Sequence, residues 1–219
     1  MQILVRKVPP AGVGVEYPLL DRIYAARGIS DIAQMDRKLS TLLSPAELPD
    51  IAKAAQRLAD AVQNQEKILI VGDFDADGAT SVALCMLAIK SLGAEHIDFL
   101  VPNRFDFGYG LSPEIVQLAQ SKSPDLIVTV DNGVASIAGV ETANAAGIDV
   151  IITDHHLPGD KLPAALALVN PNLIDSTFSS KSMAGVGVAY YVLSWVRQEL
   201  RSRDWFQQTQ REEPNLAQY

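Results

Sequence analysis

Apolar and polar positions along the chain follow two different rhythms, and the change falls near residue 66. Before it, apolar residues recur at helical spacing over residues 19–29 and again over residues 51–64. The second of these segments has a polar face, and Asp50 stands where a helix N-cap is expected. We therefore interpret residues 1–50 as a helical N-terminal extension and residues 51–219 as one α/β domain.

Five short apolar runs rich in β-branched residues follow, and helical spacing marks most of the segments between them. Nearly continuous apolar runs are typical of strands that helices cover on both faces. Strands that alternate with helices build βαβ units. We predict an α/β fold with a mostly parallel open sheet and helices on both faces. The expected strands are residues 67–73, 96–102, 125–131, 149–154 and 165–170, and the expected helices are residues 79–93, 112–122, 133–147 and 185–203.

Composition agrees with a soluble globular protein, since 48% of the 219 residues are hydrophobic and 20% are charged. No apolar run reaches the roughly 18 residues of a membrane-spanning helix, and the N-terminus lacks the pattern of a signal peptide. The single cysteine, Cys85, excludes an internal disulfide framework and a cysteine-rich zinc site. We expect a cytoplasmic protein with no membrane association.

The formal net charge of −8 disfavours a protein that binds nucleic acid through a basic surface, because such binding depends on Lys and Arg neutralising phosphates. This exclusion weakens where carboxylates hold metal ions, because the cations reverse the local field. The positions of the carboxylates therefore matter more than their sum.

Acidic and imidazole side chains follow the expected strands, whose carboxyl ends meet at the ligand-binding edge of open α/β sheets. Turn chemistry explains one such strand end, but several together would crowd repelling carboxylates unless cations compensate. These ligand types suit Mn²⁺ or Mg²⁺, and two ions that share a carboxylate commonly hydrolyse phosphodiesters. The side chains are Asp73, Asp75 and Asp77 where the first strand ends, Asp131 where the third ends, and Asp154, His155 and His156 where the fourth ends.

Three further features each allow two interpretations. Arg104, after the second strand, can hold a phosphate bidentately or balance the nearby Asp106. Tyr109 can stack on a base or pack against the protein. Gly185 and Gly187 open the last helix, whose free N–H groups can bind phosphate, although close helix packing explains two glycines equally well.

Four motifs resemble those of the DHH phosphoesterase superfamily, in the same order along the chain. The longer strings around them, among them VGDFDADGATS, TDHHLPGD and AGVGVA, are similar to a family of single-strand-specific exonucleases within it. The resemblance covers nearly the whole chain. The four motifs are Asp73-Phe74-Asp75-Ala76-Asp77-Gly78, Asn103-Arg104 with Gly108-Tyr109-Gly110, Asp131-Asn132-Gly133, and Asp154-His155-His156.

The resemblance implies two metal ions, Mn²⁺ or Mg²⁺, at the acidic edge of the sheet. The positions that match its metal ligands are Asp75, Asp77, Asp131 and His155, with Asp131 as the bridging carboxylate. Asp73 would be a ligand or lie next to the ligands.

The resemblance also implies roles for the residues around the ions. His156 would contact the scissile phosphate or help to move a proton, so that His156 and Asp131 are the catalytic candidates. Asp154 would orient a histidine. The substrate-binding candidates are Asn103, Arg104, Tyr109, Gly185 and Gly187.

The implied activity is metal-dependent degradation of single-stranded DNA from its 5′ end to mononucleotides, in DNA recombination and repair. Single-stranded DNA is the expected partner, with a single-strand-binding protein and a helicase as partners of the full-length enzyme. Two alternatives stay open. One is a DHH phosphodiesterase that acts on short oligonucleotides, cyclic dinucleotides or pyrophosphate. The other is a non-catalytic replication scaffold of the same fold, which the intact motifs disfavour.

One departure from the family concerns the end of the chain. The family has a further metal-binding Asp on a later strand, a domain that closes over the site and an oligonucleotide-binding barrel. The sequence ends at Tyr219 before any of these. The resemblance therefore predicts a fragment of a longer enzyme, with weak or no activity of its own.

Overall fold

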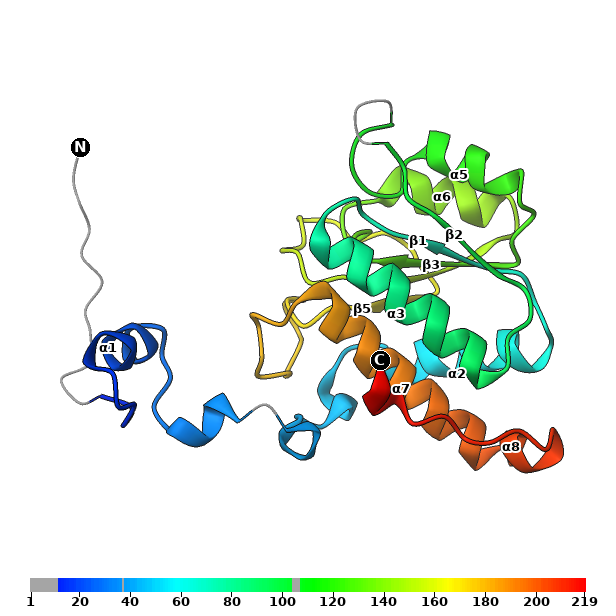
Figure 1. Cartoon of the computed structure of the whole chain (residues 1–219). Coiled ribbons are helices and arrows are strands. Elements are labelled where there is room, and N and C mark those ends of the chain that lie inside the picture. The colour runs from blue at the N-terminus through cyan, green and yellow to red at the C-terminus, as the bar shows by residue number, and fades with distance from the viewer. Residues whose placement is uncertain (1–11, 37, 104–106) are drawn as a thin grey trace. The chain divides into compact units, whose positions relative to one another are not determined.

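A five-stranded sheet forms the centre of the larger part of the chain. The structure is a computed structural model that describes residues 12–36, 38–103 and 107–219. The chain divides into two units, Met1–Leu43 and Ser44–Tyr219, and the second contains the sheet and its helices (Figure 1). This division falls between residues 43 and 44; the domain boundary that the sequence suggests, between 50 and 51, stays a prediction.

All five strands run parallel, in the order β2-β1-β3-β4-β5. Ile68 of β1 lies opposite Ile97 of β2 on one side and Leu126 of β3 on the other. The predicted α/β fold with a parallel sheet is therefore confirmed. The strands are β1 Ile68–Val71, β2 Ile97–Leu100, β3 Leu126–Val130, β4 Asp149–Thr153 and β5 Ala167–Val169.

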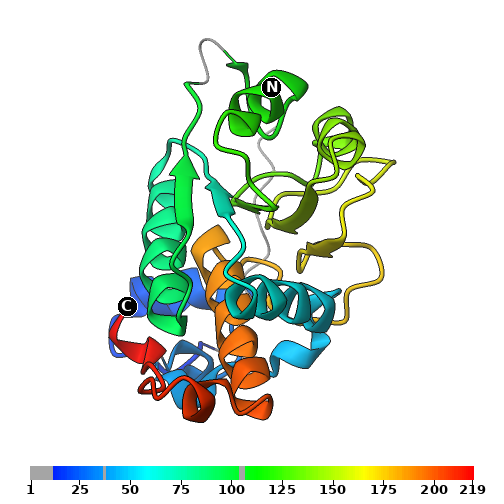
Figure 2. The ribbon, with the colours of Figure 1, turned by 90° about the vertical axis from the view of Figure 1, so that its right-hand side faces the viewer.

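Helices cover both faces of the sheet, as Figure 2 shows. One cluster of buried residues joins α2, α3 and α7 to the sheet, and a second joins α5 and α6 to its other face. This double cover explains why every residue of β1 and β3 is buried and why the strands are apolar without alternation. The helices are α2 Ile51–Gln63, α3 Ala76–Leu92, α5 Pro113–Gln120, α6 Ile137–Ala145, α7 Gly185–Ser202 and α8 Trp205–Gln208, with 3₁₀ turns at Pro45–Glu47 and Leu216–Gln218.

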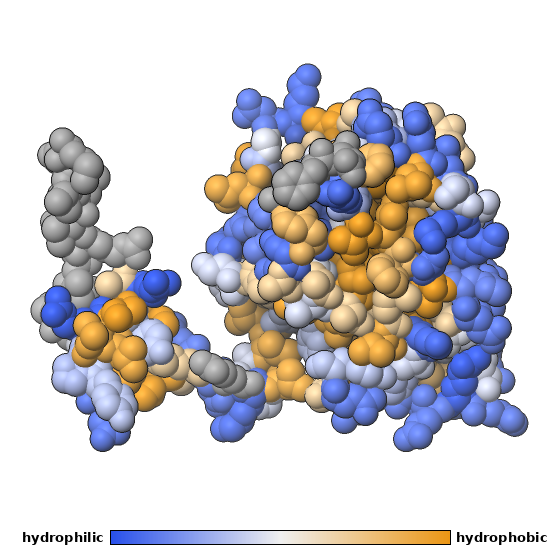
Figure 3. Space-filling view, turned by 45° about the horizontal axis from the view of Figure 1, so that its top comes forward, coloured by the Kyte–Doolittle hydropathy of each residue, from blue (hydrophilic) through white to orange (hydrophobic). Residues whose placement is uncertain are grey.

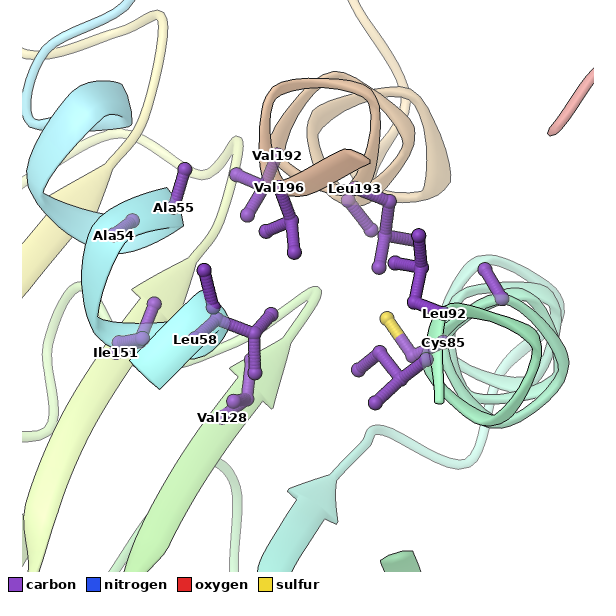
Figure 4. Packing of buried hydrophobic residues seen from close by; sticks show 14 of the residues in the cluster. Ala54, Ala55, Leu58, Cys85, Leu92, Val128, Ile151, Val192, Leu193 and Val196 are labelled. Carbon is purple, nitrogen blue, oxygen red and sulfur yellow. The ribbon is translucent and has the colours of Figure 1, made fainter. Parts of the chain in front are cut away.

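The first of these clusters brings three helices together over the central strands. In Figure 4, Leu58 of α2, Cys85 of α3 and Val192 of α7 point into the space above Val128 of β3. Burial raises the pKa of the Cys85 thiol to about 12, so this cysteine is a packing residue, as a free buried cysteine usually is.

Apolar side chains are also exposed on the larger unit, along the β2 edge of the sheet and on α3. Figure 3 shows apolar side chains gathered on one face of this unit. Leu87 of α3 is 56% exposed and Phe99 of β2 is 49% exposed. Because α3 is apolar nearly all round, its sequence alone does not show which side faces the core.

No helix in the described part of the chain is long and apolar enough to cross a membrane.

The smaller unit is built from short helical turns. It contains α1 Pro18–Ala26 and 3₁₀ turns at Ile32–Met35 and Leu39–Thr41. The helix ends at Ala26, with Arg27 as its C-cap. Gly28 follows with φ 84° and donates its N–H to Ala25 O, while Ile29 N donates to Tyr24 O. A glycine with positive φ just after the C-cap is a common way for a helix to end.

Asp50 is the N-cap residue of α2, as the sequence predicts, but its side chain has a different partner from the one expected of a cap. Asp50 does precede α2, but its side chain makes no capping hydrogen bond and its backbone has φ 53°. Its Oδ2 instead accepts a hydrogen bond from Leu168 N of β5 at 3.1 Å. The carboxylate joins the start of α2 to an edge strand, a contact that a local pattern does not reveal.

Asp50→Ala should lower the free energy of unfolding by about 1–3 kcal/mol, because Leu168 N–H loses its acceptor. The Leu168 amide should also exchange its hydrogen faster, and nuclear magnetic resonance measures this directly. Asp50→Asn is the matched control, because an amide oxygen still accepts the bond and Asn tolerates positive φ. Unchanged exchange at Leu168 in Asp50→Ala would contradict the assignment.

Candidate metal centre

The loops after β1, β3 and β4 bring the acidic and imidazole groups together at the carboxyl edge of the sheet. Ligand atoms of Asp73, Asp75 and Asp131 lie within 4.8 Å of one another, and so do those of Asp131, His155 and His156. Asp131 belongs to both groups. It therefore occupies the shared position that the sequence resemblance implies for a bridging carboxylate.

Asp131 is held in an unusual backbone conformation at the end of β3. Its φ is 61°, a region that Asp and Asn adopt more readily than other non-glycine residues. Only 1% of it is exposed, and its N–H donates to Thr153 O at 3.0 Å. Burial, together with the nearby charges of Asp77 and Asp75, raises its pKa to about 7. The charged form of this carboxylate is therefore disfavoured unless a cation lies beside it.

The loop after β1 is shaped by its own carboxylates. Asp75 caps α3, and its Oδ1 accepts from Asp77 N at 3.0 Å and from Gly78 N at 2.9 Å. Asp73 Oδ1 accepts from Phe74 N at 2.7 Å. Gly78 is required because a Cβ there would lie 2.4 Å from Asp73 O. The positive N-terminal end of α3 thus faces the acidic group and partly compensates its charge.

Asp77 joins α3 to the start of α7. Its Oδ2 accepts from Gly185 N at 3.1 Å, and it lies 3.8 Å from His155 Nε2. A Cβ on Gly185 would lie 2.2 Å from Asp131 Oδ1, whereas one on Gly187 would meet the flexible side chain of Met183 at 2.7 Å. Close approach therefore accounts for the glycine at position 185, and phosphate binding by this helix end stays a prediction.

Asp154 organises the turn that carries the two histidines. It is 1% exposed, and its Oδ1 accepts from His155 N at 2.7 Å and from His156 N at 3.1 Å. The same oxygen lies 2.7 Å from His156 Nδ1, while Oδ2 accepts from Val134 N at 2.8 Å. Burial lowers the pKa of His156, but the hydrogen bond and charge of Asp154 raise it more, so the net change is upward. This geometry supports the orienting role expected for Asp154.

The hydrogen-bond partners of the two His155 ring nitrogens show whether a cation fits the site. Its Nδ1 lies 2.8 Å from Met183 O, a pure acceptor, so Nδ1 carries the hydrogen. In the neutral ring Nε2 is then a bare lone pair, and it faces Asp131 Oδ1 at 3.1 Å. That oxygen is buried and has no hydrogen-bond partner among the described residues. Two facing lone pairs need a proton or a metal ion between them, so the residues present fit a cation.

The substrate-binding candidates lie around this cluster in part. Asn103 follows β2 on the surface, whereas Arg104 lies outside the described residues. Tyr109 donates from its hydroxyl to Asp131 O at 3.0 Å and packs edge-on against His156, with ring centroids 5.8 Å apart. Tyr109 is nevertheless 48% exposed, so base stacking stays a prediction beside the packing that the structure shows.

Three buried or half-buried amides next to the site have no role in the prediction from the sequence. Asn132 Nδ2 donates to Val71 O at 3.1 Å and to Val130 O at 2.9 Å, which ties the ends of β1 and β3 together. Asn170 and Asn172, after β5, contact the backbone of the histidine turn. A signal was present, because Asn-Pro-Asn begins at the end of the fifth expected strand, as acidic motifs begin at the ends of the first, third and fourth.

The metal-free protein should lose stability relative to Asp131→Asn as the pH rises from about 4 to 8. The folded-state pKa of about 7 lies above the ordinary value of 3.8, so the folded protein binds an extra proton between these values. Its free energy of unfolding therefore falls through that window, and at pH 8 the variant should be more stable by about 1 kcal/mol or more. Urea unfolding with a chelator at both pH values measures the difference. An equal difference at pH 4 and pH 8 would contradict this assignment.

Gly185→Ala should weaken Mn²⁺ binding by about 10–100-fold, because the added Cβ displaces the Asp131 carboxylate. The helix itself should not suffer, since Ala is a better helix former than Gly. Gly187→Ala is the matched control, because its Cβ meets only a flexible methionine. Calorimetric titration with Mn²⁺ compares the three proteins, and equal affinities would show that the close approach has no effect on the site.

The chain is similar in sequence to a known family and to curated proteins. The model of the DHH family, N-terminal domain, matches residues 67–217. The single-stranded-DNA-specific exonuclease RecJ of Escherichia coli (strain K12) is 54% identical over 200 residues, which cover 91% of this chain and 35% of that protein. The protein of the same name from Bacillus subtilis (strain 168) is 39% identical over 178 residues, which cover 79% and 22%. The chain thus spans about a third of the length of these curated relatives, or less.

Solved structures agree with the sequence relatives. A crystal structure of exonuclease RecJ bound to manganese is 33% identical, with a TM-score of 0.66, over 73% of this chain and 40% of that one. RecJ of Thermus thermophilus in complex with Mn²⁺ is 30% identical, with a TM-score of 0.64, over 81% and 24%. The family match spans the whole sheet and every residue of both ligand groups. The chain therefore belongs to the DHH family.

Proposed function

We propose that this protein hydrolyses phosphodiester bonds of single-stranded DNA with two metal ions, as a 5′-to-3′ exonuclease that releases 5′-mononucleotides in DNA recombination and repair. The observation that carries the proposal is the presence of Asp131 in two separate groups of ligand atoms. The similarity to single-stranded-DNA-specific exonucleases supports the choice of DNA over short oligonucleotides or cyclic dinucleotides. We also propose that the protein is cytoplasmic.

Two ions, Mn²⁺ or Mg²⁺, would be held by the carboxylates and imidazoles of the two groups. Asp73, Asp75 and Asp131 would hold one, and Asp131 with His155 the other, with Asp77 close to His155. When bound, such a pair lowers the pKa of a water molecule and stabilises the leaving oxygen. Solved structures of RecJ in complex with Mn²⁺ and with Mg²⁺ support the choice of ions.

His156 is the residue best placed to handle a proton. Asp154 lies 2.7 Å from its Nδ1, which keeps the hydrogen on that nitrogen, so Nε2 is the nitrogen that would gain or lose a proton. The side chain is 46% exposed, so a scissile phosphate or its leaving group can reach it. Asp154 would hold the ring in this tautomer and orientation, and His156 would accept or donate the proton.

Substrate binding would draw on residues around the ions. Asn103 and Arg104 would hold a phosphate, Tyr109 would contact a base or sugar, and the glycines that open α7 would admit the backbone closely. The net charge of −8 gives the chain little attraction for DNA without cations, so binding should depend on the metal. A single-strand-binding protein and a helicase are further proposed partners.

Asp131→Asn should reduce Mn²⁺-dependent release of mononucleotides from a single strand by on the order of 10²–10³-fold or more. The assay uses strands labelled at the 5′ or the 3′ end, so that an early labelled mononucleotide from the 5′ label shows the polarity. The exposed Asp160 supplies the control variant Asp160→Asn. Both substitutions are compared in the chain and in a chimaera in which the chain replaces the matching 200 residues of the E. coli relative.

Three results would count against the proposal. Cleavage of cyclic dinucleotides without cleavage of single strands would favour the other phosphodiesterase activity. No hydrolysis by chain or chimaera, with the E. coli protein active beside them, would favour a scaffold. Full activity in Asp131→Asn would remove Asp131 from the chemistry.

A further inference from the structure

The two adjacent histidines sit in a turn whose backbone polar groups are all paired by side chains. The N–H groups of His155 and His156 both donate to Asp154 Oδ1, at 2.7 and 3.1 Å. Their carbonyls accept from the other side. Asn172 Nδ2 donates to His155 O at 2.5 Å, and Asn170 Nδ2 donates to His156 O at 2.9 Å. Three side chains thus hold four backbone groups of this turn.

The two asparagines form one unit at the end of β5. Asn170 is 0% exposed, and its Oδ1 accepts from Asn172 N at 2.8 Å. The β5 strand itself pairs with β4, and Val169 O accepts from Asp154 N at 3.1 Å. The amides therefore follow directly after the strand that also positions the Asp154 backbone, so the turn is held between β4 and the end of β5.

The side chains that pair with this turn also determine where the lone pair of His155 Nε2 points. The ring is fixed at Nδ1 by Met183 O at 2.8 Å, and its Nε2 faces Asp131 Oδ1 at 3.1 Å. A shift of the His155 backbone would change both distances. Groups that hold metal ligands in place commonly change metal affinity by about 10–100-fold when they are removed.

We propose that Asn170 and Asn172 are positioning residues for the histidine pair, which fix the carbonyls of His155 and His156 and thereby aim His155 Nε2 at Asp131. The inference rests on the proposed function, in which this edge of the sheet holds metal ions. The amides of both asparagines donate to backbone carbonyls, so they act through the turn.

Asn172→Asp tests this proposal, because a positioning role and a simple effect of charge predict opposite changes in Mn²⁺ affinity. The carboxylate has nearly the shape of the amide but cannot donate to His155 O, so positioning predicts Mn²⁺ binding about 10–100-fold weaker. Charge alone predicts tighter binding, because a negative group is added near the cations. Asn172 is partly exposed, so this variant should fold, and Asn170→Asp tests the buried partner in the same way.

Asn144→Asp is the matched control. Asn144 lies on α6, and its Nδ2 donates to Ala164 O at 2.9 Å, so the same kind of bond is lost away from the histidines. Its Mn²⁺ affinity, measured by calorimetric titration, should equal that of the unchanged protein. Unchanged or tighter Mn²⁺ binding in Asn172→Asp would overturn the proposal.

A second measurement does not depend on metal. In the metal-free protein, kept in a chelator, the nuclear magnetic resonance signals of the His155 ring nitrogens report the Nδ1–H bond to Met183 O. These signals should shift in Asn172→Asp and stay in place in Asn144→Asp. If the unchanged protein bound no Mn²⁺, the proposed function would fail, and these signals would still decide the positioning role. Identical His155 signals in all three proteins would overturn that role.

Discussion

Repulsion among carboxylates gathered at one edge of the sheet is the constraint on which the rest of this structure depends. A parallel sheet brings its strand ends together, and here these ends carry Asp73, Asp75, Asp77, Asp131 and Asp154. Backbone N–H groups that donate to these carboxylates offset most of this repulsion. Asp73 accepts from the next residue, Asp75 caps α3, Asp77 accepts from the start of α7, and Asp154 accepts from three N–H groups.

Asp131 is treated differently. Its Oδ1 is buried without a hydrogen-bond donor in the described part of the chain, and it faces Nε2 of His155 at 3.1 Å. Two features allow this position: Asp131 has positive φ, and Gly185 has no Cβ where its carboxylate lies. Strain of this kind is typical of functional sites. This carboxylate without a donor is also the one shared by both groups of ligand atoms, which is where two cations would be bridged.

Different elements around the site position the carboxylates and the histidines, an arrangement that suits metal binding. The N-terminal ends of α3 and α7 bring partial positive charge to the carboxylates, and the β4–β5 pair carries the histidines and the amides that hold them. Each ligand is thus placed by an element that is itself packed in the core. Such preorganisation limits the movement needed when cations bind.

Local patterns in the sequence determined the strands, the helices and the order of the motifs, because apolar runs and helical spacing are properties of neighbouring residues. They also placed the acidic residues at one edge, since parallel strands end together. Tertiary structure alone decided which groups meet: Asp50 with Leu168, Asp77 with Gly185, and Asn170 and Asn172 with the histidine turn. These bonds join residues that are far apart along the chain, or use an amide that could equally have bonded within its own turn. Their geometry exists only once β5 and α7 have packed beside the site.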